Sequence, residues 1–302
     1  FGSGAAVMGT GLFSATSARA QAAAFNFEPI GIATDHSIQV PAGHSWKTLL
    51  RFGDPLFSEA ADAYSPETAV PAAMSDKVFG ENTDGMEFFE IDGKTVITVN
   101  SEYANPEINL PAANEGTPKN ADEVMLLKNI QGVTVMEVAD SGNGFEVVVD
   151  SPFNRRITHE TQMTMDGPAA GSDLVKTNAD PEGMSPKGTM NNCGSGKTLW
   201  GTYLTCEENF NGYFSSSDKS YSRSAELKRY GVNNKDRGYA WATTDERFDI
   251  SKHPNEPNRA GYVVEIDPTD PASTPKKRTA LGRFKHENAA VVVSSNGHVV
   301  AY

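Results

Sequence analysis

The sequence predicts an all-β protein with long loops and few helices. Short strand-like runs recur along its 302 residues and are separated by turn signals. Gly (27 residues) and Pro (17) are frequent, and hydrophobic residues make up a modest 38% of the chain, which suits a loop-rich β protein better than a helical one. Many short strands with turn signals are typical of a sandwich, a barrel or a β-propeller. Their spacing is too uneven to show a repeat, so periodicity does not choose among the three.

The first expected element is the remnant of an export signal peptide. Residues 1–24 are rich in Gly and Ala, weakly apolar and end in small residues that suit cleavage, although the chain shows neither an initial Met nor a charged start. The run is too short and too polar to span a membrane, and its weak hydrophobicity fits twin-arginine export. An Ala/Gly-rich tail is the alternative. We therefore expect an exported protein, periplasmic or extracellular.

Strand-like runs follow, each rich in β-branched or aromatic residues. They cover 46–52, 86–91, 94–100, 145–150, 198–204, 239–243, 261–266 and a final hairpin over 289–302. Asp92-Gly93 and Asn296-Gly297 are strong hairpin turns. Helix signals are weak and best over 121–129, while polar, Pro-rich runs such as 112–120 and 177–187 predict long loops. Because the chain stops inside the second strand of the final hairpin, we expect only part of the domain to be present.

The formal net charge of -13 limits the partners. Nucleic acid and anionic lipid are themselves negative, so we expect the protein to bind neither. An anionic small molecule would need local positive charge from metal ions or arginines. Arg155 and Arg156 are candidates for such contacts, although pairing with nearby carboxylates is the commoner role of adjacent arginines. No later segment is apolar enough to cross a membrane, and we expect a monomer.

Carboxylates follow several of the expected strands directly, and this pattern indicates a metal site. The residues concerned are Glu102 after the run 94–100, Glu207 and Glu208 after the run 198–204, and Glu287 after a further expected strand over 279–285. In a propeller the ends of the inner strands open onto a central channel, where these side chains would converge. Carboxylate and backbone oxygens suit calcium, and a thiolate adds a ligand suited to iron or zinc. For any single acid, an ordinary solvated position at the start of a loop is the alternative.

The two cysteines leave two interpretations open. Cys193 lies in the glycine-rich segment 191–197 before the expected strand 198–204, and Cys206 follows that strand. Two cysteines in an exported protein commonly form a disulfide. A strand of about six residues spans roughly 20 Å, which separates these thiols unless the segment 191–197 folds back along the strand. The same folding back is required if Cys193 and Glu207 are to serve one metal cluster.

Several motifs resemble those of the PhoX family of bacterial alkaline phosphatases. The two most specific are WGTYLTCEEN over 200–209 and RTALGRFKHE over 278–287. Further matches extend over most of the chain after the signal, at 79–85, 100–103, 154–158, 166–171, 192–193, 245–249, 258–262 and 264–268.

The resemblance implies a β-propeller that binds iron (Fe3+) and calcium, is exported by the twin-arginine route and hydrolyses phosphate monoesters at alkaline pH. Within it, Cys193 resembles the cysteine that bridges the iron ions, and Glu287 resembles a carboxylate ligand of that cluster. Glu207 and Glu208 resemble the acidic pair near it, and Glu102 lies in the family's Asn-x-Glu element. A metal-bound oxo group or hydroxide is then the expected nucleophile, with Cys193 as a ligand.

Family members run well beyond residue 302, so the resemblance implies that 25–302 is the N-terminal part of a single β-propeller phosphatase domain. The remaining ligands and a phosphate-contacting arginine are expected in the part that follows. A partial propeller leaves an open sheet edge, so we expect this piece alone to be poorly stable and inactive. The alternative function is a non-catalytic, calcium-stabilised extracellular propeller used for binding, in which the carboxylates are structural and Cys193 and Cys206 form a disulfide.

Overall fold

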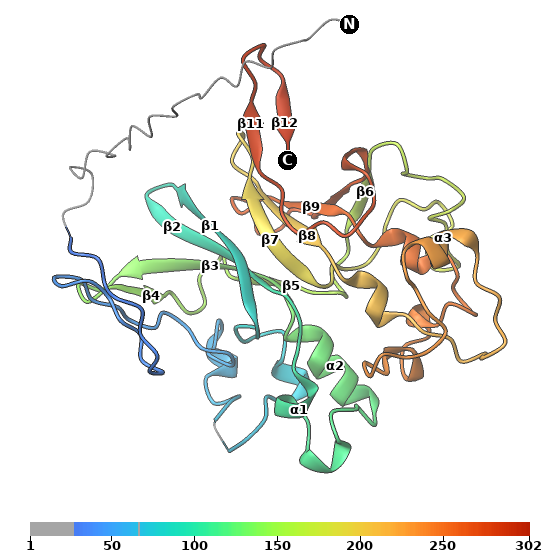
Figure 1. The fold of residues 1–302 in the computed structure, drawn as a ribbon, viewed down its shortest axis with the longest axis horizontal. Coiled ribbons are helices and arrows are strands. Elements are labelled where there is room, and N and C mark those ends of the chain that lie inside the picture. Colours follow the sequence, from blue (N-terminus) through green and yellow to red (C-terminus); the bar gives the residue numbers. More distant parts are fainter. Residues whose placement is uncertain (1–26, 66) are drawn as a thin grey trace, which may run out of the picture. The chain divides into compact units, whose positions relative to one another are not determined.

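The computed structural model describes residues 27–65 and 67–302. The expected signal remnant, 1–24, lies outside the described residues. The chain divides into two compact units, Phe1–Thr48 and Leu49–Tyr302. In the described part of the first unit, 27–48, the backbone forms neither helix nor strand, and the strand expected over 46–52 is wrong. The elements below all belong to the second unit (Figure 1).

Two five-stranded sheets form the centre of the second unit. The first runs in the order β1 (Thr83–Ile91), β2 (Lys94–Ser101), β3 (Gly132–Asp140) and β4 (Phe145–Val147), and β5 (Arg155–Ile157) also pairs with β3. The second runs in the order β6 (Thr164–Asp166), β10 (Lys276–Arg278), β9 (Val263–Ile266), β8 (Tyr203–Glu207) and β7 (Asn192–Lys197). A separate hairpin pairs β11 (Val291–Val293) with β12 (Val299–Ala301).

The helices of the described residues are short. They are α1 (Pro106–Asn109), α2 (Ala121–Asn129) and α3 (Ala225–Arg229), with single 3-10 turns between other elements. Helix α2 begins after Asn120, whose side-chain oxygen accepts a hydrogen bond from the backbone N–H of Glu123 at 2.9 Å. The helix expected over 121–129 is confirmed, as is the mainly β class with long loops and few helices. None of these helices is long and apolar enough to cross a membrane.

One buried apolar cluster is shared by the two large sheets. Phe89, Val96 and Val135 belong to the first sheet, and Tyr203 and Val264 belong to the second. The shared core holds the sheets together and brings β1 alongside β7 (Figure 1). The ends of two antiparallel hairpins, β1–β2 and β7–β8, therefore lie close together.

The β7–β8 hairpin differs from the expected arrangement. The run 198–204 was expected as a strand and 191–197 as a loop, but 192–197 is strand β7 and most of 198–204 forms the turn. The N–H of Thr198 donates to the carbonyl of Thr202 at 2.9 Å, and Gly201 supplies the positive φ of 90° that the turn needs. Three of the six β7 residues carry little strand propensity, which is why the sequence concealed this strand.

The glycines of β7 are required by a neighbouring stretch of backbone. A Cβ atom on Gly194 would overlap the carbonyl oxygen of Glu287, and a Cβ atom on Gly196 would overlap the carbonyl oxygen of Ala289. The N–H of Gly194 also donates to the Glu287 carbonyl at 2.6 Å. A strand glycine here permits close approach of another chain segment, which seats 287–289 directly on β7.

Gly196→Ala is therefore expected to destabilise the folded protein by about 1–3 kcal/mol, because the added methyl group forces the 287–289 backbone away from β7. Denaturant unfolding of the purified full-length protein measures the loss. Gly31→Ala is the control, because a Cβ there meets no atom within 4 Å, and its effect should stay below about 0.5 kcal/mol. Equal stabilities for the two variants would contradict the packing described here.

The other strand predictions are confirmed in part. Strands β1, β2, β4 and β9 overlap the expected runs 86–91, 94–100, 145–150 and 261–266, with shifted ends. Strands β11 and β12 form the expected final hairpin. The strand over 239–243 is wrong, because Gly238 and Ala240 take positive φ values of 106° and 56° and lead into a 3-10 turn that buries Trp241. Strands β3, β5, β6 and β10 were not anticipated. The strand expected over 279–285 is wrong, because Thr279–Leu281 is a 3-10 turn and none of the described residues 282–290 lies in a strand.

Candidate metal centre

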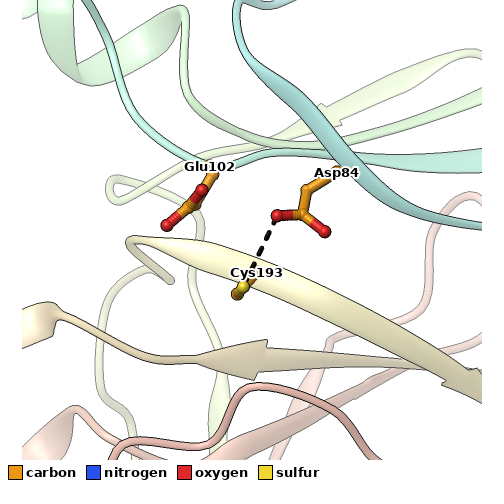
Figure 2. A group of neighbouring side chains, drawn as sticks. All are labelled: Asp84, Glu102 and Cys193. Atoms are coloured by element: carbon orange, nitrogen blue, oxygen red, sulfur yellow. Dashed lines mark hydrogen bonds between the residues drawn. The ribbon is translucent and has the colours of Figure 1, made fainter.

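Asp84, Glu102 and Cys193 form a compact group of potential metal ligands. One carboxylate oxygen of each acid and the Sγ of Cys193 all lie within 4.8 Å of one another. Figure 2 shows the three side chains next to one another, with the Cys193 thiol donating a hydrogen bond to Oδ2 of Asp84 at 3.4 Å. Cys193 is buried, and the two acids are half-buried.

The group lies where the open ends of the two hairpins meet. Asp84 is near the start of β1, and Glu102 directly follows β2. Because β1 and β2 are antiparallel, with Thr83 opposite Ser101, a strand start and a strand end share one edge. Cys193 is near the start of β7, which lies beside β1.

Two contacts fix the distance between β1–β2 and β7. The side-chain amide of Asn100 donates to the carbonyl oxygens of Cys193 (2.6 Å) and Gly194 (3.1 Å), and its own oxygen accepts from the Tyr203 hydroxyl at 2.9 Å. A Cβ atom on Gly85 would come within 2.5 Å of the Ser195 backbone nitrogen, so only glycine allows this approach.

The electrostatics of the group favour a bound cation. Burial, and then the charge and hydrogen bond of Asp84, raise the pKa of the Cys193 thiol to about 12. Burial also raises the pKa of Glu102, and the charges of Asp84, Glu208 and Glu287 raise it further. Several acids are thus held close enough to repel one another, and a cation among them would remove the repulsion.

Two other predicted ligands lie within electrostatic reach of this group. Glu208 is half-buried, and its Oε2 accepts a hydrogen bond from the side chain of Asn209 at 2.6 Å. The oxygen of the same Asn209 side chain accepts from Nζ of Lys285 at 3.1 Å. Glu287 has an exposed side chain, and its backbone is held against β7 at Gly194.

The structure does not bring Glu207 into the group. Its side chain is fully buried and forms an ion pair of 2.7 Å with Lys277, which is also buried. The second carboxylate oxygen accepts hydrogen bonds from the backbone N–H groups of Gly261 (2.9 Å) and Tyr262 (3.1 Å). Adjacent residues at a strand end point to opposite sides, so Glu207 and Glu208 serve different surroundings.

The guanidinium groups of the two candidate arginines, Arg155 and Arg156, form hydrogen bonds within the protein. The Arg155 guanidinium donates to the backbone carbonyls of Asp267, Pro271 and Ser273. The Arg156 guanidinium is buried and donates to Thr134 Oγ1 and to the carbonyls of Asn129 and Gln131. These hydrogen bonds, made by the terminal nitrogens of the two guanidinium groups, hold loops and strands in place.

Both cysteines carry free thiols. Cys206 is fully buried in an apolar cluster with Leu204, Val263 and Ala289. Cys193 lies in the group of acids described above. The folding back that the sequence analysis required for Cys193 does occur, because β7 runs antiparallel to β8.

Asp84 was missed by the sequence analysis. The acids that the strand pattern singles out follow the ends of strands, whereas Asp84 precedes the expected strand 86–91. The signal was nevertheless present, because the Asp92-Gly93 turn predicts that the strands on either side are antiparallel. The start of the first strand must then lie beside Glu102 at the end of the second.

The comparisons with known proteins agree on one family. Residues 25–302 match a family model described as alkaline phosphatase PhoX. A solved structure, Pseudomonas fluorescens PhoX in complex with vanadate, a transition state analogue, matches with a TM-score of 0.86 and 44% sequence identity. The match covers 91% of this chain and 48% of that one, so the chain spans about half the length of the solved relative. No curated protein matches the chain.

Proposed function

Because the chain belongs to the PhoX family of alkaline phosphatases, we propose that the protein hydrolyses phosphate monoesters at alkaline pH with a cluster of iron and calcium ions. The observation that carries the proposal is the convergence of Asp84, Glu102 and Cys193 on one point. Two carboxylates offer the hard oxygens that calcium prefers, and the thiol offers the softer ligand that suits iron. The donor set therefore fits the mixed cluster.

Within residues 25–302, ligands of such a cluster would come from five residues: Cys193, Asp84, Glu102, Glu208 and Glu287. Bound cations would stabilise the negative charge that develops on the transferring phosphoryl oxygens. Cys193 acts as a ligand and not as the attacking group, because without a cation its raised pKa keeps the thiol protonated. Glu207 belongs to the fold, through its ion pair with Lys277.

The fold supports the same proposal. The two five-stranded sheets share an apolar core, and β1 of the first runs beside β7 of the second, as neighbouring blades of a propeller do. In that arrangement β1 and β7 are the strands next to the channel, and the ligand group lies at one end of it. We further propose twin-arginine export to the periplasm or the exterior, and a monomeric state.

The free thiols bear on the alternative, a calcium-stabilised binding module. That function was tied to a disulfide between Cys193 and Cys206, and the structure instead directs Cys193 toward Asp84 and places Cys206 in an apolar cluster. The arrangement favours the enzyme.

Metal removal tests the function. The full-length, metal-loaded protein is expected to release p-nitrophenol from p-nitrophenyl phosphate at alkaline pH, and bis(p-nitrophenyl) phosphate is the diester control. Chelation should abolish turnover, and iron together with calcium should restore it, because neither the carboxylates nor the thiol can stabilise phosphoryl charge alone. Vanadate should inhibit. A protein of verified iron and calcium content that leaves the monoester intact would refute the proposal.

A further inference from the structure

The β1–β2 and β7–β8 hairpins share the same irregularity at the same place. In the first, Thr83 lies opposite Ser101, but Met86 lies opposite Val99, so β1 carries one extra residue. In the second, Asn192 lies opposite Glu207, but Ser195 lies opposite Thr205, so β7 also carries one extra residue. These bulges contain Asp84-Gly85 in β1 and Cys193-Gly194 in β7. A bulge re-aims the side chain it contains, and here each bulge contains a proposed ligand.

An asparagine in a left-handed backbone conformation precedes each bulge by the same number of residues. Asn82 has a φ of 48°, and Asn191 has a φ of 50°. The carbonyl of Asn82 accepts the backbone N–H of Glu102 at 2.9 Å, and the carbonyl of Asn191 accepts the backbone N–H of Glu208 at 3.0 Å. Each asparagine thus holds the backbone of the acid that directly follows the opposite strand.

The asparagine side chains complete the same link one residue further on. The Asn82 side chain donates to the Tyr103 carbonyl at 2.9 Å, and the Asn191 side-chain oxygen accepts the N–H of Asn209 at 2.6 Å. Both contacts are to the residue that directly follows the acid. The direction of the bond differs, because Asn82 uses its amide nitrogen and Asn191 uses its amide oxygen.

We propose that the two hairpins are copies of one ligand-presenting unit, in which Asn82 and Asn191 are the positioning residues. Asp84 in the first copy corresponds to Cys193 in the second, and Glu102 corresponds to Glu208. The sequence conceals this duplication for two reasons. The strands are unevenly spaced, and the two corresponding segments share only their first residue, Asn, and their fourth, Gly: Asn82-Thr83-Asp84-Gly85 and Asn191-Asn192-Cys193-Gly194. The inference rests on the proposed metal site.

The correspondence between the two hairpins explains why an asparagine stands at both position 82 and position 191. Asparagine tolerates the left-handed conformation better than most residues with a side chain, and glycine tolerates it more readily still but makes no side-chain bond. Without the side-chain bond, the segment after each strand keeps the backbone contact but loses its second link to the asparagine, and the carboxylate of Glu102 or Glu208 is less firmly directed. Partners of this kind commonly change metal affinity by about 10–100-fold when removed.

The test measures calcium affinity of the full-length, metal-free protein by calorimetry, alongside its thermal unfolding midpoint. Asn82→Gly and Asn191→Gly keep the backbone conformation and remove the side-chain bonds, which for Asn191 include one donated to the Tyr213 hydroxyl at 3.3 Å. Each variant is expected to weaken calcium binding about tenfold or more. Asn120→Ala is the matched control, because Asn120 caps α2 and belongs to neither hairpin. It should lower the midpoint and leave calcium affinity unchanged.

Two isosteric variants separate positioning from general structural damage. Asn191→Asp keeps the acceptor for the Asn209 N–H and should retain calcium affinity. Asn82→Asp replaces the donor with a carboxylate that faces the Tyr103 carbonyl, and should lose affinity. Unchanged affinity in both glycine variants, or equal losses in both aspartate variants, would overturn the inference. A wild-type protein that binds neither calcium nor iron would instead refute the proposed function.

Discussion

Glu207→Gln is expected to destabilise the folded protein by about 3–5 kcal/mol, because it leaves the ammonium of Lys277 buried without a counter-charge. The side chains of Lys277 and Glu207 are 1% and 0% exposed, so water cannot replace the lost partner. Glutamine can still accept the two backbone hydrogen bonds that Glu207 accepts from Gly261 and Tyr262. The loss therefore isolates the charge. Chemical denaturation of the metal-free protein measures it.

The loss should shrink as the pH rises. Burial lowers the pKa of Lys277, and the charge of Glu207 opposes that shift, so removing the charge lowers the pKa further. The folded variant then binds fewer protons at Lys277 than the unfolded chain, whose lysine pKa is about 10.4, and its stability rises with pH toward that value. Wild-type protein should show a smaller rise.

Two variants serve as controls for the ion pair. Glu208→Gln removes a half-exposed neighbour of Glu207 and should change stability by less than about 1 kcal/mol. The double variant Glu207→Leu with Lys277→Met should recover most of the stability, because it removes both charges together. A Glu207→Gln protein as stable as Glu208→Gln would show that the buried pair contributes nothing.

Cys193→Ala is expected to abolish iron binding and to lower phosphatase turnover more than about 100-fold. Removing a residue that merely hydrogen-bonds to a metal ligand already lowers metal affinity or activity about 10–100-fold, and removing a ligand should cost more. The Cys193 thiol is the one soft donor among the three residues of the group, and Asp84 and Glu102 offer only oxygens. Elemental analysis and the p-nitrophenyl phosphate assay are run on the same preparations of full-length protein.

Cys206→Ala is the matched control for the second cysteine. Cys206 packs against Leu204 and Val263, so its loss should lower stability while iron content and turnover persist. Calcium content should fall less than iron content in Cys193→Ala, since the carboxylates remain. Retained iron and activity in Cys193→Ala would remove Cys193 from the ligand set.

Local signals were strong enough to predict part of the fold. Helix α2 was expected with the bounds that the structure shows, and in the structure the Asn120 side chain caps its first turn. Strand β2 was found from its run of β-branched residues, and the acid after it, Glu102, lies in the ligand group. These inferences needed only neighbours in the sequence.

The errors arose where distant segments decide the structure. The glycines of β7 suggest a loop until the 287–289 backbone that covers them is known. Glu207 looked like a ligand because Lys277, seventy residues away, was not a visible partner. Strand alternation at the end of β8 separates Glu207 from Glu208. His286 is buried and Glu287 is exposed, although neither residue lies in a strand.

Asn100 connects the ligand group to the packing of the two sheets. Its amide holds the carbonyl of Cys193, and its oxygen is bound by Tyr203 in the core that both sheets share. A metal ion bound by Cys193, Asp84 and Glu102 would therefore also strengthen the contact between the two sheets. Binding to the folded form alone adds about 2.7 kcal/mol of stability when free metal exceeds its Kd a hundredfold. When metal is scarce, the protein would then lose stability and be degraded faster by proteases, in addition to losing its proposed activity.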